Sequence, residues 1–397
     1  MIEWLERVDE NRPFLKVGDT TWSYGQTLTE VNRRSGPTAR LSKPSLTPES
    51  IFDLVAGLAS GGMTVVGPQP ETALAEGGSH LVVFTSGSSG KPKGVRLTRS
   101  NLEAAAAAST AHLGHGAEDD WLLAMPLHHV GGLSIVVRQM YTGGSITMLP
   151  SFNATEFATA MKGGVTMASV VPTMLRRLLK LGPFTALRAV LVGGGPIPKG
   201  LLEEAAAAGL PVLPTYGMTE TFGQVATLRP GSTLGHRAHP LPDVEIRITS
   251  DGLIAVRGDQ VSPGYVGEPD RADPWFVTND LGELDEEGAL VVLGRADTMI
   301  VTGGENVDPE QVEAVLLEHG GLEEFVVVGV PNEEWGQVVT CLYVGEVDVS
   351  VIEAFCSERL PRFMVPKKWV EVEKIPRTSL GKPDRRAASA SSLGDDG

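Results

Sequence analysis

The chain has 397 residues, 42% of them hydrophobic, and 33 basic against 49 acidic residues give a formal charge of −16. This length predicts more than one domain, and the acidic balance argues against nucleic acid as a partner. No apolar run reaches the roughly 18 residues of a membrane span. Cys341 and Cys356 lie in no metal-binding or redox spacing and the N-terminus has no signal-peptide pattern, so we expect a cytoplasmic protein.

The most informative segment is residues 85–94, Thr-Ser-Gly-Ser-Ser-Gly-Lys-Pro-Lys-Gly. It follows an apolar strand pattern at 81–84 and precedes an S-x-x-E capping box, Ser100 to Glu103, which opens an alanine-rich helix. Glycines let backbone N–H groups approach an anion, and hydroxyl and lysine side chains bind phosphate oxygens. The spacing does not match a Walker A loop. The segment therefore predicts a phosphate-binding loop of another kind, the alternative being a flexible linker.

Strand and helix patterns alternate through the next part of the chain. Strands are expected at 165–171, at 188–192 and from 211, and helices at 172–179 and 198–208. This β-α-β-α order predicts a parallel sheet, in which ligands bind beyond the carboxyl ends of the strands. Thr85, Gly193 and Tyr216 each follow a predicted strand, so we expect them to converge on one crevice.

The pattern changes after residue 225. Alternating segments at 244–248 and 253–257, separated by Ser-Asp-Gly, predict an antiparallel hairpin. Asp308, with Pro309 and Gln311 after it, predicts the start of a helix that reaches His319. Further elements are expected as strands at 324–330 and 337–344 and a helix at 350–359, which together predict a small α/β domain.

Four other segments have the composition of ligand-binding loops. They are 216–220 (Tyr-Gly-Met-Thr-Glu), 278–282 (Thr-Asn-Asp-Leu-Gly), 294–307 (beginning Gly-Arg-Ala-Asp) and 376–383 (Pro-Arg-Thr-Ser-Leu-Gly-Lys-Pro). Glu220 is a candidate ligand for Mg²⁺, a hard cation that prefers oxygen. Asp280 could accept two ribose hydroxyls. Lys382 lies on a glycine-flanked loop, where its charge could stabilise a developing anion.

All five segments, in this order, resemble the signatures of the acyl-adenylate-forming superfamily, which includes acyl-CoA synthetases, peptide-synthetase adenylation domains and luciferases. The resemblance covers most of residues 81–385. It implies an AMP-forming acid–thiol ligase that uses ATP, Mg²⁺ and CoA. In the first step a carboxylate attacks the α-phosphate of ATP; the C-terminal domain then rotates and a thiol attacks the acyl-adenylate. One departure is Asn279, where the family pattern has glycine before the aspartate.

The resemblance also implies roles for individual residues. Lys382, His129 and Glu220 would be catalytic, with Glu220 holding the metal. Asp297 would be the hinge, and Gly303 and Gly304 would contact CoA. The implied ATP- and AMP-binding residues are Thr85, Ser86, Gly87, Ser88, Ser89, Gly90, Lys91, Lys93, Gly194, Gly195, Pro196, Tyr216, Gly217, Met218, Thr219, Asp280 and Arg295.

We therefore expect an α/β fold with a large N-terminal domain, residues 1–294, that contains parallel-rich sheets and a β-rich subdomain. A hinge at 295–298 would lead to a small, mobile α+β C-terminal domain at 299–386. The small polar residues at 387–397 predict a disordered tail. The sequence leaves the oligomeric state open, a homodimer included.

Three segments suggest the acid that is activated. The amino-acid sequences of residues 125–138, 168–179 and 193–198 resemble those of the o-succinylbenzoate–CoA ligase branch of the superfamily, which serves menaquinone biosynthesis. The implied acid-binding residues are His129, Arg138, Val170, Gly194 and Gly217. The substrate has two carboxylates, so a cation should hold the one that is not activated, and Arg138 is the candidate unless it lies on the surface. A ligase for another aryl or short acid, and an adenylation enzyme that loads a carrier protein, stay open as alternatives.

Overall fold

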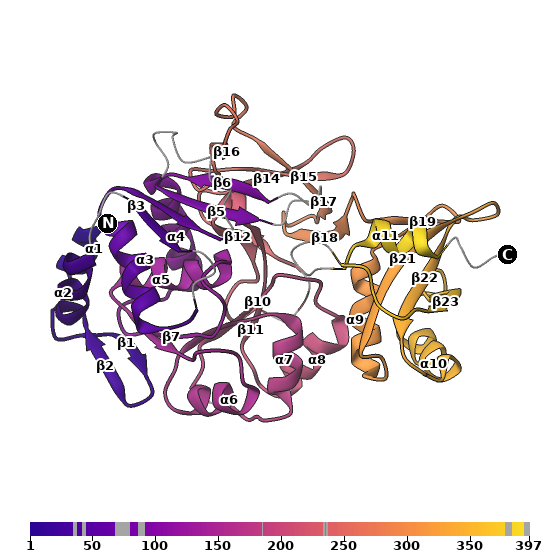
Figure 1. Cartoon of the computed structure of the whole chain (residues 1–397), viewed down its shortest axis with the longest axis horizontal. Helices are drawn as coiled ribbons and strands as arrows, with labels where there is room; N and C mark the ends of the chain where they lie inside the picture. Colours follow the sequence, from indigo (N-terminus) through magenta and orange to yellow (C-terminus); the bar gives the residue numbers. More distant parts are fainter. Residues whose placement is uncertain are drawn as a thin grey trace.

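The structure is a computed structural model that describes residues 1–34, 38–41, 45–67, 80–85, 92–184, 186–232, 235, 237–377 and 383–392. A large N-terminal domain, which carries the first 18 strands, lies beside a smaller C-terminal domain. Figure 1 shows the C-terminal domain in orange and yellow, with helix α9 (Pro309–His319) facing the larger domain. Among the described residues, no helix combines the length and the apolar character needed to cross a membrane.

The largest sheet in the described part of the chain has the strand order β13-β12-β11-β10-β9-β7-β8-β1-β2. Its middle, from β11 to β1, is parallel, whereas β2, β12 and β13 are antiparallel to their neighbours. The strands are β1 (Pro13–Val17), β2 (Thr20–Ser23), β7 (Asp120–Leu123), β8 (Ser145–Met148), β9 (Met167–Val170), β10 (Ala189–Val192), β11 (Val212–Met218), β12 (Gly223–Thr227) and β13 (His239–Pro240). The parallel order confirms the prediction drawn from the alternating pattern.

Two smaller sheets complete the N-terminal domain. The first has the order β16-β6-β5-β4-β3 and the second the order β14-β15-β17-β18, which is antiparallel throughout. Their strands are β3 (Thr38–Leu41), β4 (Met63–Val66), β5 (Leu81–Thr85), β6 (Lys93–Leu97), β14 (Glu245–Ile248), β15 (Leu253–Arg257), β16 (Gly264–Tyr265), β17 (Phe276–Leu284) and β18 (Leu290–Arg295).

The C-terminal domain has a sheet of its own. Its order is β20-β19-β22-β21, with β23 paired to β22. The strands are β19 (Ile300–Thr302), β20 (Glu305–Val307), β21 (Glu324–Asn332), β22 (Gly336–Val344) and β23 (Lys368–Glu371). Buried Val327, Val339 and Cys341 pack on the flanking helices and give this domain a separate hydrophobic core. Residues 296–299 connect this sheet to the last strand of the N-terminal domain.

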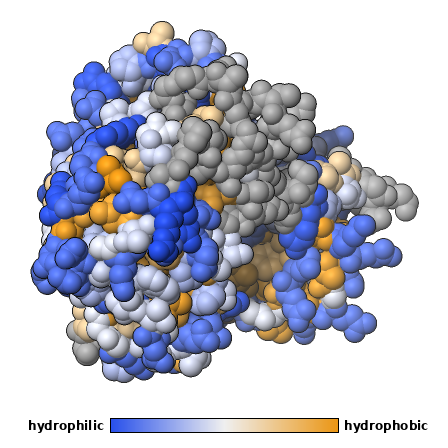
Figure 2. Space-filling view, turned by 60° about the vertical axis from the view of Figure 1, so that its left-hand side comes forward, coloured by the Kyte–Doolittle hydropathy of each residue, from blue (hydrophilic) through white to orange (hydrophobic). Residues whose placement is uncertain are grey.

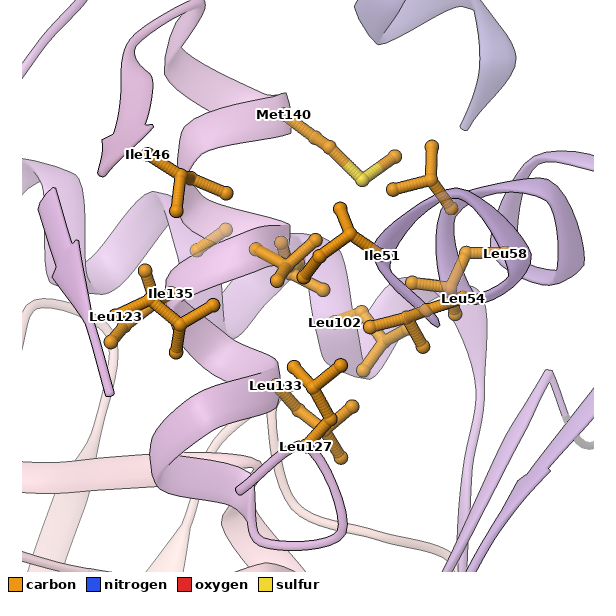
Figure 3. Packing of buried hydrophobic residues seen from close by; sticks show 14 of the residues in the cluster. Ile51, Leu54, Leu58, Leu102, Leu123, Leu127, Leu133, Ile135, Met140 and Ile146 are labelled. Carbon is orange, nitrogen blue, oxygen red and sulfur yellow. The ribbon is translucent and has the colours of Figure 1, made fainter. Parts of the chain in front are cut away.

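Helices cover the sheets and close the cores between them. They are α1 (Ile2–Glu6), α2 (Tyr24–Arg34), α3 (Pro48–Ala59), α4 (Arg99–Leu113), α5 (Val130–Thr142), α6 (Ala154–Lys162), α7 (Pro172–Leu179), α8 (Lys199–Ala207), α9, α10 (Val349–Arg359) and α11 (Arg385–Ser391), with a 3₁₀ turn, η1, at Thr219–Thr221. Helix α5 matters most for function. Figure 3 shows Leu133, Ile135 and Met140 of this helix among buried side chains from α3, α4 and the neighbouring strands. Because α5 is buried on nearly all sides, its polar residues are held in fixed positions.

Two local predictions were wrong. The N-cap of α4 is Thr98 rather than Ser100, because strand β6 ends at Leu97 and Thr98 stays extended. Thr98 Oγ1 accepts from the Asn101 N–H at 3.2 Å, and the Asn101 side chain accepts from the Thr98 N–H at 2.8 Å.

The second error concerns the tail that was expected to be disordered from residue 387. Residues 387–391 belong instead to helix α11, because Ala388 is fully buried and Arg385 forms an ion pair with Glu313 of α9. Residues 393–397 lie outside the described part of the chain.

Candidate functional site

The two domains enclose one large cleft of ≈ 2950 Å³. Figure 2 shows a recess between the larger and the smaller part of the molecule. The cleft is lined by the carboxyl ends of β9, β10 and β11, by β17 and β18, and by helix α9 from the C-terminal domain. A drug-sized ligand needs roughly 300–1,000 Å³, so this space can take several ligand groups at once.

One end of the cleft holds the strand ends that flank the predicted phosphate loop. Thr85 ends β5 and Lys93 begins β6, and both line the cleft. The Thr85 hydroxyl donates to the carbonyl of Lys93 at 3.4 Å, a weak bond that joins the two ends of the loop. The predicted loop residues Ser86, Gly87, Ser88, Ser89, Gly90 and Lys91 lie outside the described residues.

Glycines at two strand ends give the cleft its close backbone wall. Gly194 has φ +79°, a conformation that side chains rarely adopt, and it lines the cleft with Gly195 and Pro196. At Gly217 a Cβ would come within 1.9 Å of the Gly223 carbonyl oxygen, so only glycine fits where β11 turns into β12. Both glycines line the cleft, and at Gly217 the missing side chain makes room for the Gly223 backbone.

Tyr216, Asp280 and Arg295 form a hydrogen-bonded group on the cleft wall. The Tyr216 hydroxyl donates to Asp280 Oδ2 at 2.7 Å, and Arg295 lies 3.4 Å from Asp280 Oδ1. Burial, followed by the Asp280 charge, raises the pKa of Tyr216, so its hydroxyl keeps its proton. Arg295 also reaches Asp297 at 3.1 Å. A carboxylate has about four lone-pair positions, so Asp280 can still accept hydroxyl groups from a ligand while these partners fix its orientation.

Glu220 lies on η1, directly after Thr219, and its carboxylate lines the same cleft. Its Oε1 accepts a hydrogen bond from the Tyr265 hydroxyl at 2.8 Å. Within the described residues, no cluster of three or more His, Cys, Asp or Glu side chains could hold a metal by itself. Mg²⁺ is commonly bound through one or two carboxylates together with substrate phosphates. A single carboxylate in the cleft that Thr85 and Lys93 also line fits that mode of binding.

A second region of the cleft lies against helix α5. His129 is the N-cap of this helix, and its ring centroid lies 4.3 Å from that of His128. Arg138, on the inner face of the helix, is only 5% exposed and lines the cleft. Its guanidinium lies 5.1 Å from the ring centroid of Trp121, a cation–π contact.

Arg138 is a buried charge without an acidic partner among the described residues. Burial alone lowers its pKa to about 9, and no neighbouring acid counteracts the shift. A Cβ at Gly223 would lie 3.8 Å from Arg138 Nη2, and Ser134 lies beside the same position, so small residues border the guanidinium. Buried charges are ordinarily paired, which makes this arginine a candidate receptor for an anion.

The C-terminal domain contributes charged, polar and apolar residues to the wall of the cleft. Glu310, Gln311 and Glu318 of α9 line the cleft, as do residues 383–387. Arg176 of α7 pairs with Glu318 at 3.1 Å, and Gln311 Nε2 donates to the carbonyl of Leu293 at 3.3 Å. These contacts hold α9 against the N-terminal domain.

Some predicted residues lie apart from this cleft or outside the described chain. Gly303 and Gly304 form the turn between β19 and β20 and do not line it. Lys382 lies outside the described residues, although Pro383, its neighbour in the chain, lines the cleft.

The cleft brings together residues that lie far apart in the sequence. The predicted residues that line it are Thr85, Lys93, His129, Arg138, Val170, Gly194, Gly195, Pro196, Tyr216, Gly217, Met218, Thr219, Glu220, Asp280, Arg295 and Asp297. Sequence reasoning missed Tyr265, Trp121 and Ser134, which contact or border members of this set. The one available signal was the Gly264-Tyr265 pair at the end of a β-rich segment, which by itself suggests only a turn.

Comparison with known proteins finds two family models that match this chain. A family model described as AMP-binding enzyme matches residues 58–266, and a model of the AMP-binding enzyme C-terminal domain matches residues 311–382. The chain belongs to the AMP-binding enzyme family. The predicted superfamily, the enzyme class and the α/β fold class are therefore confirmed.

Individual members of the AMP-binding enzyme family are similar over most of the chain. The 2-succinylbenzoate–CoA ligase of Bacillus mycoides is 42% identical, over 80% of this chain and 71% of that protein. The o-succinylbenzoate CoA synthetase of Bacillus subtilis, in complex with the acyl-adenylate intermediate OSB-AMP, superposes with a TM-score of 0.85 at 28% identity, covering 99% of this chain and 98% of the other. The same enzyme with ATP and magnesium ion gives 0.82 at 28% identity, covering 96% and 98%.

Proposed function

We propose that this protein activates o-succinylbenzoate with ATP and transfers the acyl group to CoA, giving o-succinylbenzoyl-CoA, AMP and pyrophosphate. The similarity to ligases of this acid and the interdomain cleft support the proposal. The observation that carries the choice of acid is Arg138, a buried cation that faces the cleft without an acidic partner among the described residues. A dicarboxylic acid supplies one carboxylate for activation and a second one for this guanidinium.

The apolar part of the substrate has a matching surface. The cleft that Arg138 lines is also lined by the apolar side chains of Met125, Val130, Val170, Val171 and Met174. An aromatic ring buried against these side chains would gain the usual hydrophobic stabilisation, and Gly194 and Gly217 line the same cleft. His129, at the start of α5, would lie between this acyl region and the phosphates.

In the first step the free carboxylate attacks the α-phosphorus of ATP. An acyl–phosphate anhydride bond forms, the bond between the α-phosphorus and its bridging oxygen to the β-phosphorus breaks, and pyrophosphate leaves. Thr85 and Lys93 would bind phosphate oxygens, and Asp280 would accept the ribose hydroxyls beside Tyr216. Glu220 would hold Mg²⁺, which supplies charge neutralisation on the phosphates when bound. Lys382 would stabilise the negative charge that develops at the reacting carboxylate and α-phosphate.

In the second step the thiol of CoA releases its proton to solvent and its sulfur attacks the acyl carbonyl carbon. The thioester bond forms as the acyl–phosphate bond breaks, and AMP is released. A rotation of the C-terminal domain at Asp297 would bring Gly303 and Gly304 to the cleft. Both have positive φ, +58° and +86°, and a Cβ at Gly304 would meet nothing within 4 Å, so Gly304 offers open backbone that a thin thiol-bearing arm could pass.

The test is thioester formation across a panel of acids with ATP and CoA. We expect o-succinylbenzoate to be preferred strongly over benzoate, 4-substituted benzoates, acetate and octanoate. A preference for one of those acids would overturn the substrate but keep the adenylation chemistry, and pyrophosphate release without a CoA thioester would indicate a carrier protein as acceptor. Lys382→Ala should abolish adenylate formation while thioester formation from supplied adenylate continues; unchanged turnover would refute its role.

A further inference from the structure

We propose that Tyr265 is a positioning residue for the nucleotide, acting through Glu220 and Lys93. Its hydroxyl would orient the Glu220 carboxylate for binding Mg²⁺, and its ring holds the Lys93 ammonium at the start of β6. This inference rests on the proposed function, because it concerns how that function's ATP and Mg²⁺ are held.

The contact with Glu220 is made by both side chain and backbone. The Tyr265 hydroxyl donates to Glu220 Oε1 at 2.8 Å, and the Ser262 N–H donates to the Glu220 carbonyl at 2.7 Å. Residues 262–265 therefore hold η1 at two points. The hydroxyl binds one oxygen of the Glu220 carboxylate and so restricts the rotation of this side chain. The second carboxylate oxygen is thereby held in one direction and can still bind a metal.

The contact with Lys93 comes from strand pairing. Strand β16 (Gly264–Tyr265) is antiparallel to β6, with Tyr265 opposite Val95, and Arg96 Nε donates to the Tyr265 carbonyl at 3.0 Å. This pairing places the tyrosine ring under Lys93, whose Nζ lies 5.2 Å from the ring centroid. Tyr265 thus links strand β6, which begins at Lys93, to the turn η1, which carries Glu220.

The backbone around Tyr265 is itself fixed. Ser262 Oγ donates to the Arg96 carbonyl at 2.6 Å and accepts from the Gly264 N–H at 3.0 Å. Gly264 has φ +148° and a Cβ there would meet Arg96 Nη2 at 3.3 Å, so the chain passes close to β6. A rigid scaffold of this kind is what orientation of a metal-binding carboxylate needs.

Tyr265 could instead be a packing residue, because part of its ring contacts the main hydrophobic core. The two roles differ in what Tyr265→Phe should change. This variant removes the hydroxyl and keeps the ring, so packing and the contact with Lys93 persist while Glu220 loses its donor. Loss of a partner that orients a metal ligand typically weakens metal binding about 10- to 100-fold.

The experiment is calorimetric titration of ATP into the full-length protein without acid, with and without MgCl₂, so that no turnover occurs. In the wild type we expect ATP to bind more tightly with Mg²⁺ than without it, and we call this difference in affinity the Mg²⁺ advantage. For Tyr265→Phe we expect affinity to fall by about tenfold with Mg²⁺ and by less than about twofold without it. An unchanged Mg²⁺ advantage, or equal losses in both conditions, would overturn the inference.

Two further variants separate positioning from general damage. In a Glu220→Gln background, Tyr265→Phe should produce no further loss of the Mg²⁺ advantage; independent losses would overturn the inference. Tyr141→Phe, remote from the cleft, is the matched control and should bind ATP as the wild type does. If the wild type binds ATP with this Tyr265 dependence but does not convert o-succinylbenzoate, the proposed function fails and the inference stands.

Discussion

Replacing Arg138 with methionine should raise stability and lower substrate discrimination at the same time. Arg138 is 5% exposed, and its guanidinium contacts the Trp121 ring and has no acidic partner among the described residues. Methionine fills similar space without the charge. A residue kept only for folding would not show opposite effects on stability and activity, so the variant tests the anion-receptor role directly.

The effect on stability follows from the pKa of Arg138. Burial lowers it from 12.5 to about 9, and one pKa unit corresponds to 1.36 kcal/mol, so the buried charge costs about 5 kcal/mol. Because pH 7 lies below both values, the arginine is charged when folded and unfolded, and the whole cost applies. Losing the cation–π contact removes about 2 kcal/mol of stabilisation. We expect a net gain of roughly 1–3 kcal/mol in the free energy of unfolding.

The effect on catalysis has the opposite sign. Removing one partner of a buried, hydrogen-bonded charge pair typically costs about 2–5 kcal/mol, which corresponds to a roughly 30- to 4,000-fold fall in kcat/KM for o-succinylbenzoate. For an acid that lacks the second carboxylate, the fall in kcat/KM caused by Arg138→Met should be much smaller. Comparing 4-oxo-4-phenylbutanoate with 2-butanoylbenzoate also identifies which carboxylate Arg138 binds, because each analogue retains only one of the two.

The assays are thermal unfolding of the ligand-free protein and steady-state thioester formation with the three acids. Arg188→Met is the matched control, since Arg188 is paired with buried Asp119 at 2.6 Å. That variant should lose stability and keep the wild-type preference among acids. The reasoning is refuted if Arg138→Met lowers the unfolding midpoint, or if it leaves the preference for the dicarboxylate unchanged.

Three other variants test separate parts of the structure. Burial raises the pKa of Asp308 to about 7, so its charge destabilises the fold increasingly as pH rises from about 4 to 7; Asp308→Asn should raise the free energy of unfolding by up to about 4 kcal/mol at pH 8 and by only about 1–2 kcal/mol at pH 5. Asp348→Asn, at an exposed N-cap, is its control and should show no such gain; equal shifts for both would contradict the argument. The charged groups near Asp308 are Glu310, Glu313 and Arg385. Glu318→Gln breaks the interdomain pair with Arg176 and should slow pyrophosphate release about two- to fivefold, as expected for a half-buried pair; a rate equal to the wild type would show that the pair does not hold the domains. Asp280→Asn should raise KM for ATP about tenfold and leave KM for the acid unchanged; a change confined to the acid would contradict its ribose role.

The sequence determined the local elements and the order of the ligand-binding segments. Strand β10, helix α7 and the cap of α9 by Asp308 follow the predicted patterns, because these depend on neighbours within a few residues. The strand pattern likewise predicted Tyr216 and Glu220 just after a strand that starts near residue 212; the strand runs on through Tyr216 to Met218, and Glu220 follows it on η1.

Only the tertiary structure decided which side chains meet. The Tyr265–Glu220 bond spans 45 residues and the Tyr216–Asp280 bond spans 64, and no local pattern encodes either distance. The sequence left Arg138 open between a surface and a pocket position; packing of α5 on all sides decided for the pocket. Burial and long-range pairing depend on how whole sheets and helices stack, whereas caps, turns and periodicities are local, and this difference sets what the sequence alone could determine.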